Sequence, residues 1–476
     1  MADASASAIG KSPDRGAPGR GARDRKKLGP WMVLALVIGN LIGSGVYLLP
    51  ATLAPLGMNQ IIGWLVTITG ALALAIVFAR LSAKRPLAGG PYAYVQAAFG
   101  PFPGYVTAWS YWVMLWAGNG ALAVAVVSNL SLIFPVIARI SGAPAVLAVG
   151  CVWLLTGVNI RGVRKAGDIS LVTTIIKLMP LVVVIGLGAV LWLRGAPTVV
   201  QPHVPISGGR IAMAAGLTFW GFLGLESATV PAEKVENAAR IVPIATLLGT
   251  VVAGLIYMGI SLALLGYMPN QIAAASPAPV ADFLGRYFGG TVAGTVAVFA
   301  AISAFGTLNG FILVQGEMPL AMARGGVFPR WFARETAAGT PARAHVVSSL
   351  LLSVVTLLNF GRGMGDLFTF IASISLAAGM LPYAMTMIAA IRLLPGERAL
   401  VPVALFATLF TGWATWGLGG EAVAYGAVLI VIGLPIYWLV RRNGGIDPAP
   451  GPTPDPASGP SPAPDAALST GSTGRG

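Results

Sequence analysis

One acidic residue, Glu226, lies inside the apolar run FWGFLGLESATVPAEK at residues 219–234. Gly221 and Gly224 precede it and Pro231 follows it, so a helix here is expected to be interrupted near its middle. A carboxyl group at membrane depth is costly and usually faces a cavity or a partner, which makes Glu226 a candidate functional residue. The alternative is a carboxyl group that a neighbouring helix neutralises, or that stays protonated and chemically inert.

A second interruption lies in GNLIGSGVYLLP, residues 39–50, within an apolar run that begins at Trp31. A glycine in a helix interior costs roughly 1 kcal/mol relative to alanine. The glycines therefore form either a small-residue face for close helix packing or a break in the helix. A broken helix exposes N–H groups that attract a carboxylate and C=O groups that attract a cation, and an amino acid carries both charges.

The composition indicates whether water or membrane lipid surrounds these segments. Of the 476 residues, 56% are hydrophobic and 10% are charged, with a mean hydropathy of +0.80. Soluble domains contain about 25% charged residues, so the chain is expected to be a polytopic membrane protein. Apolar windows of about 20 residues predict twelve transmembrane helices near 31–56, 60–82, 102–134, 143–160, 168–194, 209–231, 242–267, 289–317, 344–361, 364–391, 400–418 and 421–440.

The distribution of Lys and Arg predicts the orientation in the membrane. With an N-terminus inside, 24 of these residues fall on the inner side, five fall outside and Lys177 lies within a span. This asymmetry places both termini in the cytoplasm, as a multi-pass protein of the plasma (inner) membrane. It also accounts for the net charge of +14 without nucleic acid. The single Cys151 and the two distant histidines, His203 and His345, supply neither a disulfide nor a metal cluster, so no metal and no cofactor are expected.

The interruptions in spans 1 and 6 fall at corresponding places in two halves of the chain. Such a correspondence is typical of an inverted-repeat transporter with its site near the bilayer midplane. The expected fold is all-α, with a first repeat at 29–195, a second at 209–391 and two further helices at 400–441. The basic stretch 1–28 and the Pro- and Ala-rich tail 442–476 are expected to be disordered and cytoplasmic.

Four segments resemble motifs of the amino acid–polyamine–organocation (APC) superfamily, and their order matches from about residue 30 to residue 440. Within it, the bacterial arginine/agmatine exchangers are the most similar. The resemblance implies the five-plus-five, LeuT-like APC fold with helices 1 and 6 unwound. The segments are GNLIGSGVYLLPATLAPLG, GGPYAYVQAAFGPFPGY, FWGFLGLESATVPAEKVENAARIVPIA and ARGGVFPRWFARETAAGTP.

The resemblance also implies a substrate site. Backbone groups from the first interruption would receive the carboxylate, and carbonyls near Trp220 and Leu223 would hold the α-ammonium beside the Trp220 ring. Tyr111 would close above the substrate, and Glu226 would couple protonation to its release. Asn40 would steady the unwound helix. The remaining positions are Leu41, Gly43, Ser44 and Gly45 at the carboxylate, and Asn119 and Ser373 at the substrate side chain.

Three positions differ from the arginine exchangers. Leu115, Leu122 and Phe311 stand where those proteins have a small thiol, a methionine and a tryptophan. Phe311 can still stack on a planar cation, but the subsite is more apolar. Lysine, ornithine, a polyamine and neutral amino acids therefore remain open as substrates.

Lys177 is the other departure, in VTTIIKLMPLV about ten residues into its span. Proton-coupled and sodium-independent relatives have a lysine there, whose ammonium resembles a replacement for bound sodium. A buried lysine could also carry protons. The alternative is a lysine that extends to a lipid headgroup, but its depth favours the first interpretation.

A secondary active transporter of amino acids or their amines accounts for both breaks and for Glu226. An ion channel or a membrane enzyme does not, because no symmetric filter and no catalytic constellation is present in the sequence. Sodium-independent exchange and proton-coupled symport of broader specificity remain alternatives. The expected partners are a small amino acid or amine, membrane lipid and, left open, protons and a second copy of the chain as a homodimer.

Overall fold

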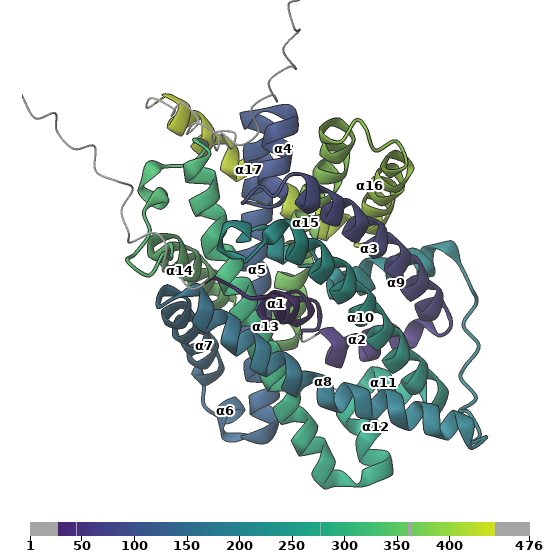
Figure 1. Cartoon of the computed structure of the whole chain (residues 1–476). Coiled ribbons are helices and arrows are strands. Elements are labelled where there is room, and N and C mark those ends of the chain that lie inside the picture. Colours follow the sequence, from purple (N-terminus) through teal and green to yellow (C-terminus); the bar gives the residue numbers. More distant parts are fainter. Residues whose placement is uncertain (1–26, 44, 277, 360–363, 443–476) are drawn as a thin grey trace, which may run out of the picture.

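The computed structural model describes residues 27–43, 45–276, 278–359 and 364–442, and this part of the chain is helical (Figure 1). A single isolated β-bridge joins Leu28 and Val235 within it. The first half contains α1 (Pro30–Leu41), α2 (Gly45–Leu53), α3 (Asn59–Lys84), α4 (Pro91–Phe99), α5 (Pro101–Ile133), α6 (Val136–Arg139), α7 (Ala143–Ile160) and α8 (Val163–Leu193). The second half contains α9 (Gly208–Phe219), α10 (Ala238–Tyr267), α11 (Asn270–Ala275), α12 (Pro279–Phe288), α13 (Gly290–Arg324), α14 (Ala342–Asn359), α15 (Met364–Leu393), α16 (Leu400–Gly417) and α17 (Gly420–Arg442).

The long helices have the length and the surface of membrane spans. Ten helices in the described residues are long and apolar enough to cross a bilayer, and α1 and most of α14 are shorter apolar helices. Large apolar side chains cover the outside of the bundle, such as Leu193 at 75% exposure and Leu409 at 73%. In water such a surface would be unfavourable, whereas lipid tails accept it. The protein is therefore a multi-pass membrane protein.

Two of the apolar segments do not form continuous helices. The helix α1 ends at Leu41, and α2 begins at Gly45. After α9 ends at Phe219, the chain passes through three short 3₁₀ helices, η3 (Trp220–Phe222), η4 (Ser227–Thr229) and η5 (Ala232–Lys234), before α10 begins. These are the two segments in which the sequence predicts interruptions.

Side chains from other helices satisfy the carbonyl groups at the end of α1. The Tyr257 hydroxyl donates to the Leu41 carbonyl at 2.8 Å, and the Thr307 hydroxyl donates to the Gly39 carbonyl at 2.7 Å. Ser303 donates to the Gly43 carbonyl at 3.3 Å. Away from water an unpaired carbonyl is costly, so these contacts stabilise a helix end inside the bundle. Figure 1 shows α1 end-on near the middle of the molecule, where it packs against α8, α10 and α13.

The N-terminal end of α1 is attached to the segment that follows η4. Leu28 donates its N–H to the Lys234 carbonyl at 2.8 Å and accepts from the Glu236 N–H at 3.1 Å. Its side chain is buried and lies against Gly167 at the start of α8. The start of α1, the start of α8 and the end of η5 therefore lie at one end of the bundle.

Candidate functional site

A small cavity of about 30 Å³ lies between the two interrupted segments. Space of this size holds about two water molecules, so an amino acid can enter only if the surrounding side chains move. The wall is contributed by α1, α2, α5, α10, α13, α15 and the segment around η3. The lining residues are Asn40, Leu41, Gly43, Gly45, Met114, Leu115, Gly118, Leu122, Trp220, Leu223, Tyr257, Thr307, Phe311 and Ser375.

Nine of the lining residues are among those expected from the sequence. They are Asn40, Leu41, Gly43, Gly45, Leu115, Leu122, Trp220, Leu223 and Phe311. Ser44 lies outside the described residues. The structure thus brings together most of the expected site, and whether these residues bind substrate stays a prediction.

Glycines allow the aromatic side chains of this cavity to approach the backbone. A Cβ atom at Gly45 would lie 2.9 Å from the Trp220 ring, so a larger residue there would displace the indole. Gly224 has a φ of 98°, and a Cβ there would lie 2.7 Å from the Phe311 ring. Only glycine fits both requirements at position 224 without strain.

Asn40 occupies the wall of the cavity at the end of α1. Its side chain is 3% exposed, and neither carboxamide atom has a hydrogen-bond partner within the described part of the chain. The Asn40 oxygen packs against Gly310, where a Cβ would lie 2.0 Å from it. The residue therefore fills the space between α1 and α13 and leaves hydrogen-bonding capacity at the cavity.

Glu226 lies just beyond the cavity and is fully buried. Tyr111 donates its hydroxyl to one carboxyl oxygen at 2.5 Å, and Tyr383 donates to the other at 2.5 Å. Tyr383 also accepts a hydrogen bond from the Gly224 N–H at 3.1 Å. We call Tyr111, Glu226 and Tyr383 the carboxyl triad. It joins α5 and α15 to the interrupted segment after α9.

Lys177 lies on α8 with its side chain fully buried. Its ammonium donates to the Gly39 carbonyl at 2.6 Å and to the Thr307 hydroxyl at 3.1 Å. A cation at the C-terminal end of a helix interacts favourably with the helix dipole. The Lys177 side chain thus contacts the broken end of α1, which contradicts the alternative in which it extends to a lipid headgroup.

Asn119 and Ser373 do not line the cavity. The Asn119 carboxamide donates to the Gln315 side chain at 2.8 Å, and Ser373 is half-buried. Ser375 lines the cavity instead and donates to the Met114 carbonyl at 2.7 Å. The position of Met114 and Gly118 follows from helical spacing, since they lie eight and four residues before Leu122 and so share its face of α5. No sequence pattern indicates Tyr257 or Tyr383.

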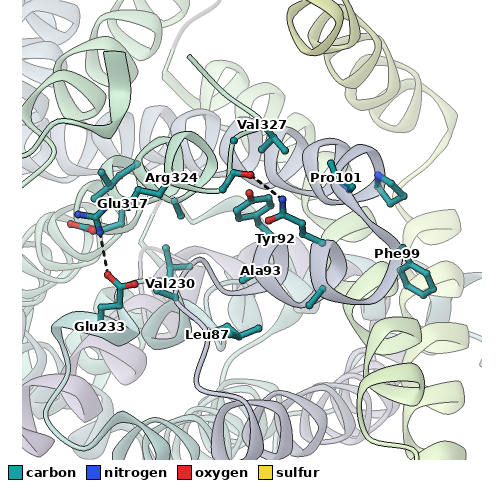
Figure 2. A pocket seen from close by; sticks show the side chains of 18 of the residues that line it. Leu87, Tyr92, Ala93, Phe99, Pro101, Val230, Glu233, Glu317, Arg324 and Val327 are labelled. Carbon is teal, nitrogen blue, oxygen red and sulfur yellow. Dashed lines mark hydrogen bonds and ion pairs between the residues drawn. The ribbon is translucent and has the colours of Figure 1, made fainter. Parts of the chain in front are cut away.

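A larger recess, which we call the vestibule, is lined by parts of α4, α13, α17 and the segment around η5 (Figure 2). It has a volume of about 1120 Å³. The interrupted segment connects the two spaces, because Leu223 lines the cavity whereas Val230 and Pro231 line the vestibule. Glu226 lies between these residues in the chain, so the carboxyl triad is attached to the segment that joins the two spaces.

An ion-pair network forms one wall of the vestibule. Lys234 contacts Glu317 at 2.6 Å and Glu335 at 3.2 Å. Arg324 contacts Glu233 at 3.1 Å and Glu335 at 3.0 Å. Figure 2 shows Glu233 and Arg324 facing each other at this wall. The network connects η5 to the end of α13 and to the segment that follows η6 (Arg330–Ala333).

Comparisons with known proteins agree with this architecture. The cadaverine/lysine antiporter of Escherichia coli strain K12 is 34% identical over 366 residues, which cover 75% of this chain and 82% of that protein. The putrescine transporter PotE of Haemophilus influenzae is 30% identical over 423 residues, covering 87% of this chain and 97% of that one. A solved structure of a Na⁺-coupled sialic acid symporter has a similar fold, with a TM-score of 0.51, 12% identity and coverage of 87% and 93%. The profile of the family described as amino acid permease matches residues 28–440. The chain therefore belongs to the amino acid permease family, and it is a membrane transporter rather than an enzyme.

Proposed function

We propose that this protein exchanges a basic amino acid for its amine across the plasma (inner) membrane by alternating access, without sodium. The observation that carries the proposal is the cavity between two interrupted helices, with the carboxyl triad on the second of them. Its relatives include a cadaverine/lysine antiporter and a putrescine transporter, which supports lysine and its diamine as the first pair to test.

Twelve spans in a five-plus-five inverted repeat fit this mechanism. In this assignment α1 with α2 forms the unwound first span, and α9 with η3 to η5 forms the unwound sixth. The repeats cover 29–195 and 209–391, followed by 400–441. Both termini are cytoplasmic, since the Lys and Arg residues concentrate on that side, and the vestibule then opens to the cytoplasm.

The charged groups of the substrate have complementary backbone at the cavity. The N–H groups that begin α2 at Ser44 and Gly45 receive the carboxylate. Carbonyls near Trp220 and Leu223 hold the α-ammonium. Phe311 stacks on the distal cation, and Asn119 and Ser373 would meet the side chain if substrate entry rearranges α5 and α15.

Glu226 couples release to protonation in this proposal. As a carboxylate it attracts a substrate ammonium and accepts hydrogen bonds from Tyr111 and Tyr383, which keeps the passage to the vestibule closed. Proton binding removes the attraction and weakens both hydrogen bonds, so the passage opens as the cation leaves.

Exchange is tested with purified protein in liposomes. Labelled lysine should enter vesicles loaded with cadaverine or lysine and should not accumulate in empty ones. The panel extends to arginine, ornithine, putrescine, agmatine and leucine. A variant with Gly45→Leu provides the inactive control, because the added side chain would displace Trp220.

Proton-coupled symport of broader specificity is the second candidate. The apolar side chains of Leu115 and Leu122 in the cavity wall favour it. Uptake of neutral amino acids into empty vesicles, driven by an inward proton gradient, would establish symport and contradict exchange.

A further inference from the structure

A series of buried polar side chains connects α5 through α13 and α14 to α7. The Asn119 carboxamide nitrogen donates to the Gln315 side-chain oxygen at 2.8 Å, and the Gln315 nitrogen donates to the Ser349 hydroxyl at 3.2 Å. The Ser349 hydroxyl in turn lies 2.6 Å from the Thr156 hydroxyl. Each of these four side chains, which we call the amide network, is 0–1% exposed. None of the four lines the cavity or the vestibule.

One acceptor of the amide network is unused. The Asn119 carboxamide oxygen has no hydrogen-bond partner among the described residues, although the side chain is fully buried. A buried acceptor in this state is costly, and native proteins contain few of them without a functional reason. Because Ser349 accepts from the Gln315 nitrogen, the Gln315 oxygen faces Asn119 and binds its nitrogen. Gln315 therefore determines that the oxygen of Asn119, and not its nitrogen, is the free atom.

Helical spacing places Asn119 on the face of α5 that forms the cavity wall. Leu115 lies four residues before it and Leu122 three residues after it, and both line the cavity. Residues three and four positions apart share a helix face. On α13, Gln315 lies about one turn after Phe311, which also lines the cavity. Asn119 and Gln315 therefore adjoin the space into which the cavity enlarges when α5 and α13 separate around a substrate.

We propose that Gln315 is a positioning residue that makes the site selective for substrates with a distal ammonium group. It holds the Asn119 carboxamide with its oxygen free, and that oxygen accepts a hydrogen bond from the distal ammonium of lysine or of its diamine. The methylene groups of the substrate pack on Leu115 and Leu122. A carboxamide suits this role, because it accepts from a cation without placing a carboxylate in an apolar wall. The inference rests on the proposed function and deepens it by naming the group that the site recognises.

The test uses pairs of ligands that differ only in the distal ammonium, namely lysine with norleucine and cadaverine with pentylamine. Binding to the purified full-length protein is measured by calorimetry. Gln315→Met has a side chain of similar length but cannot accept from Asn119, whose carboxamide is then free to turn its nitrogen toward the ammonium. This variant should bind lysine and cadaverine about 10-fold more weakly and should bind norleucine and pentylamine within about two-fold of the wild type. Gln315→Glu keeps an oxygen acceptor for Asn119 and should retain the wild-type preference for the ammonium.

A second buried amide pair on α13 provides the matched control. Asn159 donates to the Asn309 side-chain oxygen at 3.1 Å, and neither residue lines the cavity. Asn309→Leu should lower the thermal stability without changing the preference for the ammonium. Equal weakening of all four ligands in Gln315→Met, or an undiminished preference in that variant, would overturn the inference and leave the proposed function in place. Loss of the preference in Gln315→Glu, which decides the question if Gln315→Met does not fold, would do the same. A wild-type protein that binds both members of each pair equally well would overturn the inference together with the proposed preference for basic substrates.

Discussion

Replacing Glu226 with glutamine separates the charge of the carboxyl triad from its shape. The Glu226→Gln side chain fills the same space between Tyr111 and Tyr383, but it cannot titrate. In the structure each tyrosine donates to the carboxyl group at 2.5 Å. A carboxamide can accept from one of them with its oxygen and donate to the other with its nitrogen, so both contacts persist as neutral hydrogen bonds.

The size of the effect follows from the change in hydrogen-bond type. Hydrogen bonds to charged groups contribute about 1.5–3 kcal/mol and neutral ones about 0.5–1.5 kcal/mol. Each of the two bonds therefore loses about 1 kcal/mol, and the closed passage is destabilised by about 2 kcal/mol in all, or about 30-fold in its closed-to-open equilibrium. The variant should bind substrate more weakly and exchange at a rate that no longer depends on pH through this site.

The assay is lysine exchange in liposomes over about pH 5 to 8, with substrate binding measured in parallel. Glu421→Gln, the same substitution at an exposed acid at the start of α17, is the matched control and should keep the wild-type profile. A wild-type pH profile for Glu226→Gln would refute this reasoning and leave Lys177 as the next candidate for proton coupling.

The same geometry yields three further expectations. Gly45→Leu should abolish substrate binding measured by calorimetry, because its side chain would displace Trp220; full binding would exclude this part of the cavity as the carboxylate site. Phe311→Ala should raise KM for lysine about 2- to 30-fold, the equivalent of a cation–π contact of about 0.5–2 kcal/mol, while an unchanged KM would assign Phe311 to packing alone. Transport should be indifferent to replacing sodium with choline at fixed membrane potential, because the Lys177 ammonium already donates to the Gly39 carbonyl; a sodium requirement would contradict the assigned role of Lys177.

Sequence patterns predict the parts of the cavity that are formed by interrupted helices. Glycines and a buried acid in apolar runs mark both interrupted segments, and six of the fourteen lining residues lie in them. The depth of Lys177 in its span similarly predicts a buried side chain, which the structure confirms at 0% exposure.

Residues that reach the site from distant helices have no such signal. Tyr383 is 157 positions from Glu226, and Thr307 is 130 positions from Lys177. Residues two positions apart on a helix point in different directions. Ser375 therefore lines the cavity, whereas Ser373 does not. Only the packing of one helix against another decides which of the two faces inward.

The positions of Lys177 and Glu226 together restrict how transport can be driven. A bound sodium ion can leave with the substrate and so carry the energy of its gradient, whereas an ammonium on a lysine side chain stays in place. In the proposed role, Lys177 stabilises the end of α1 in every step of the cycle and couples to no gradient. The driving force must then come from the counter-substrate or from a proton that reaches Glu226. Glu226 lies in the chain between Leu223 at the cavity and Val230 at the vestibule. We therefore expect its proton to come from the vestibule, so that protonation times release while exchange supplies the energy.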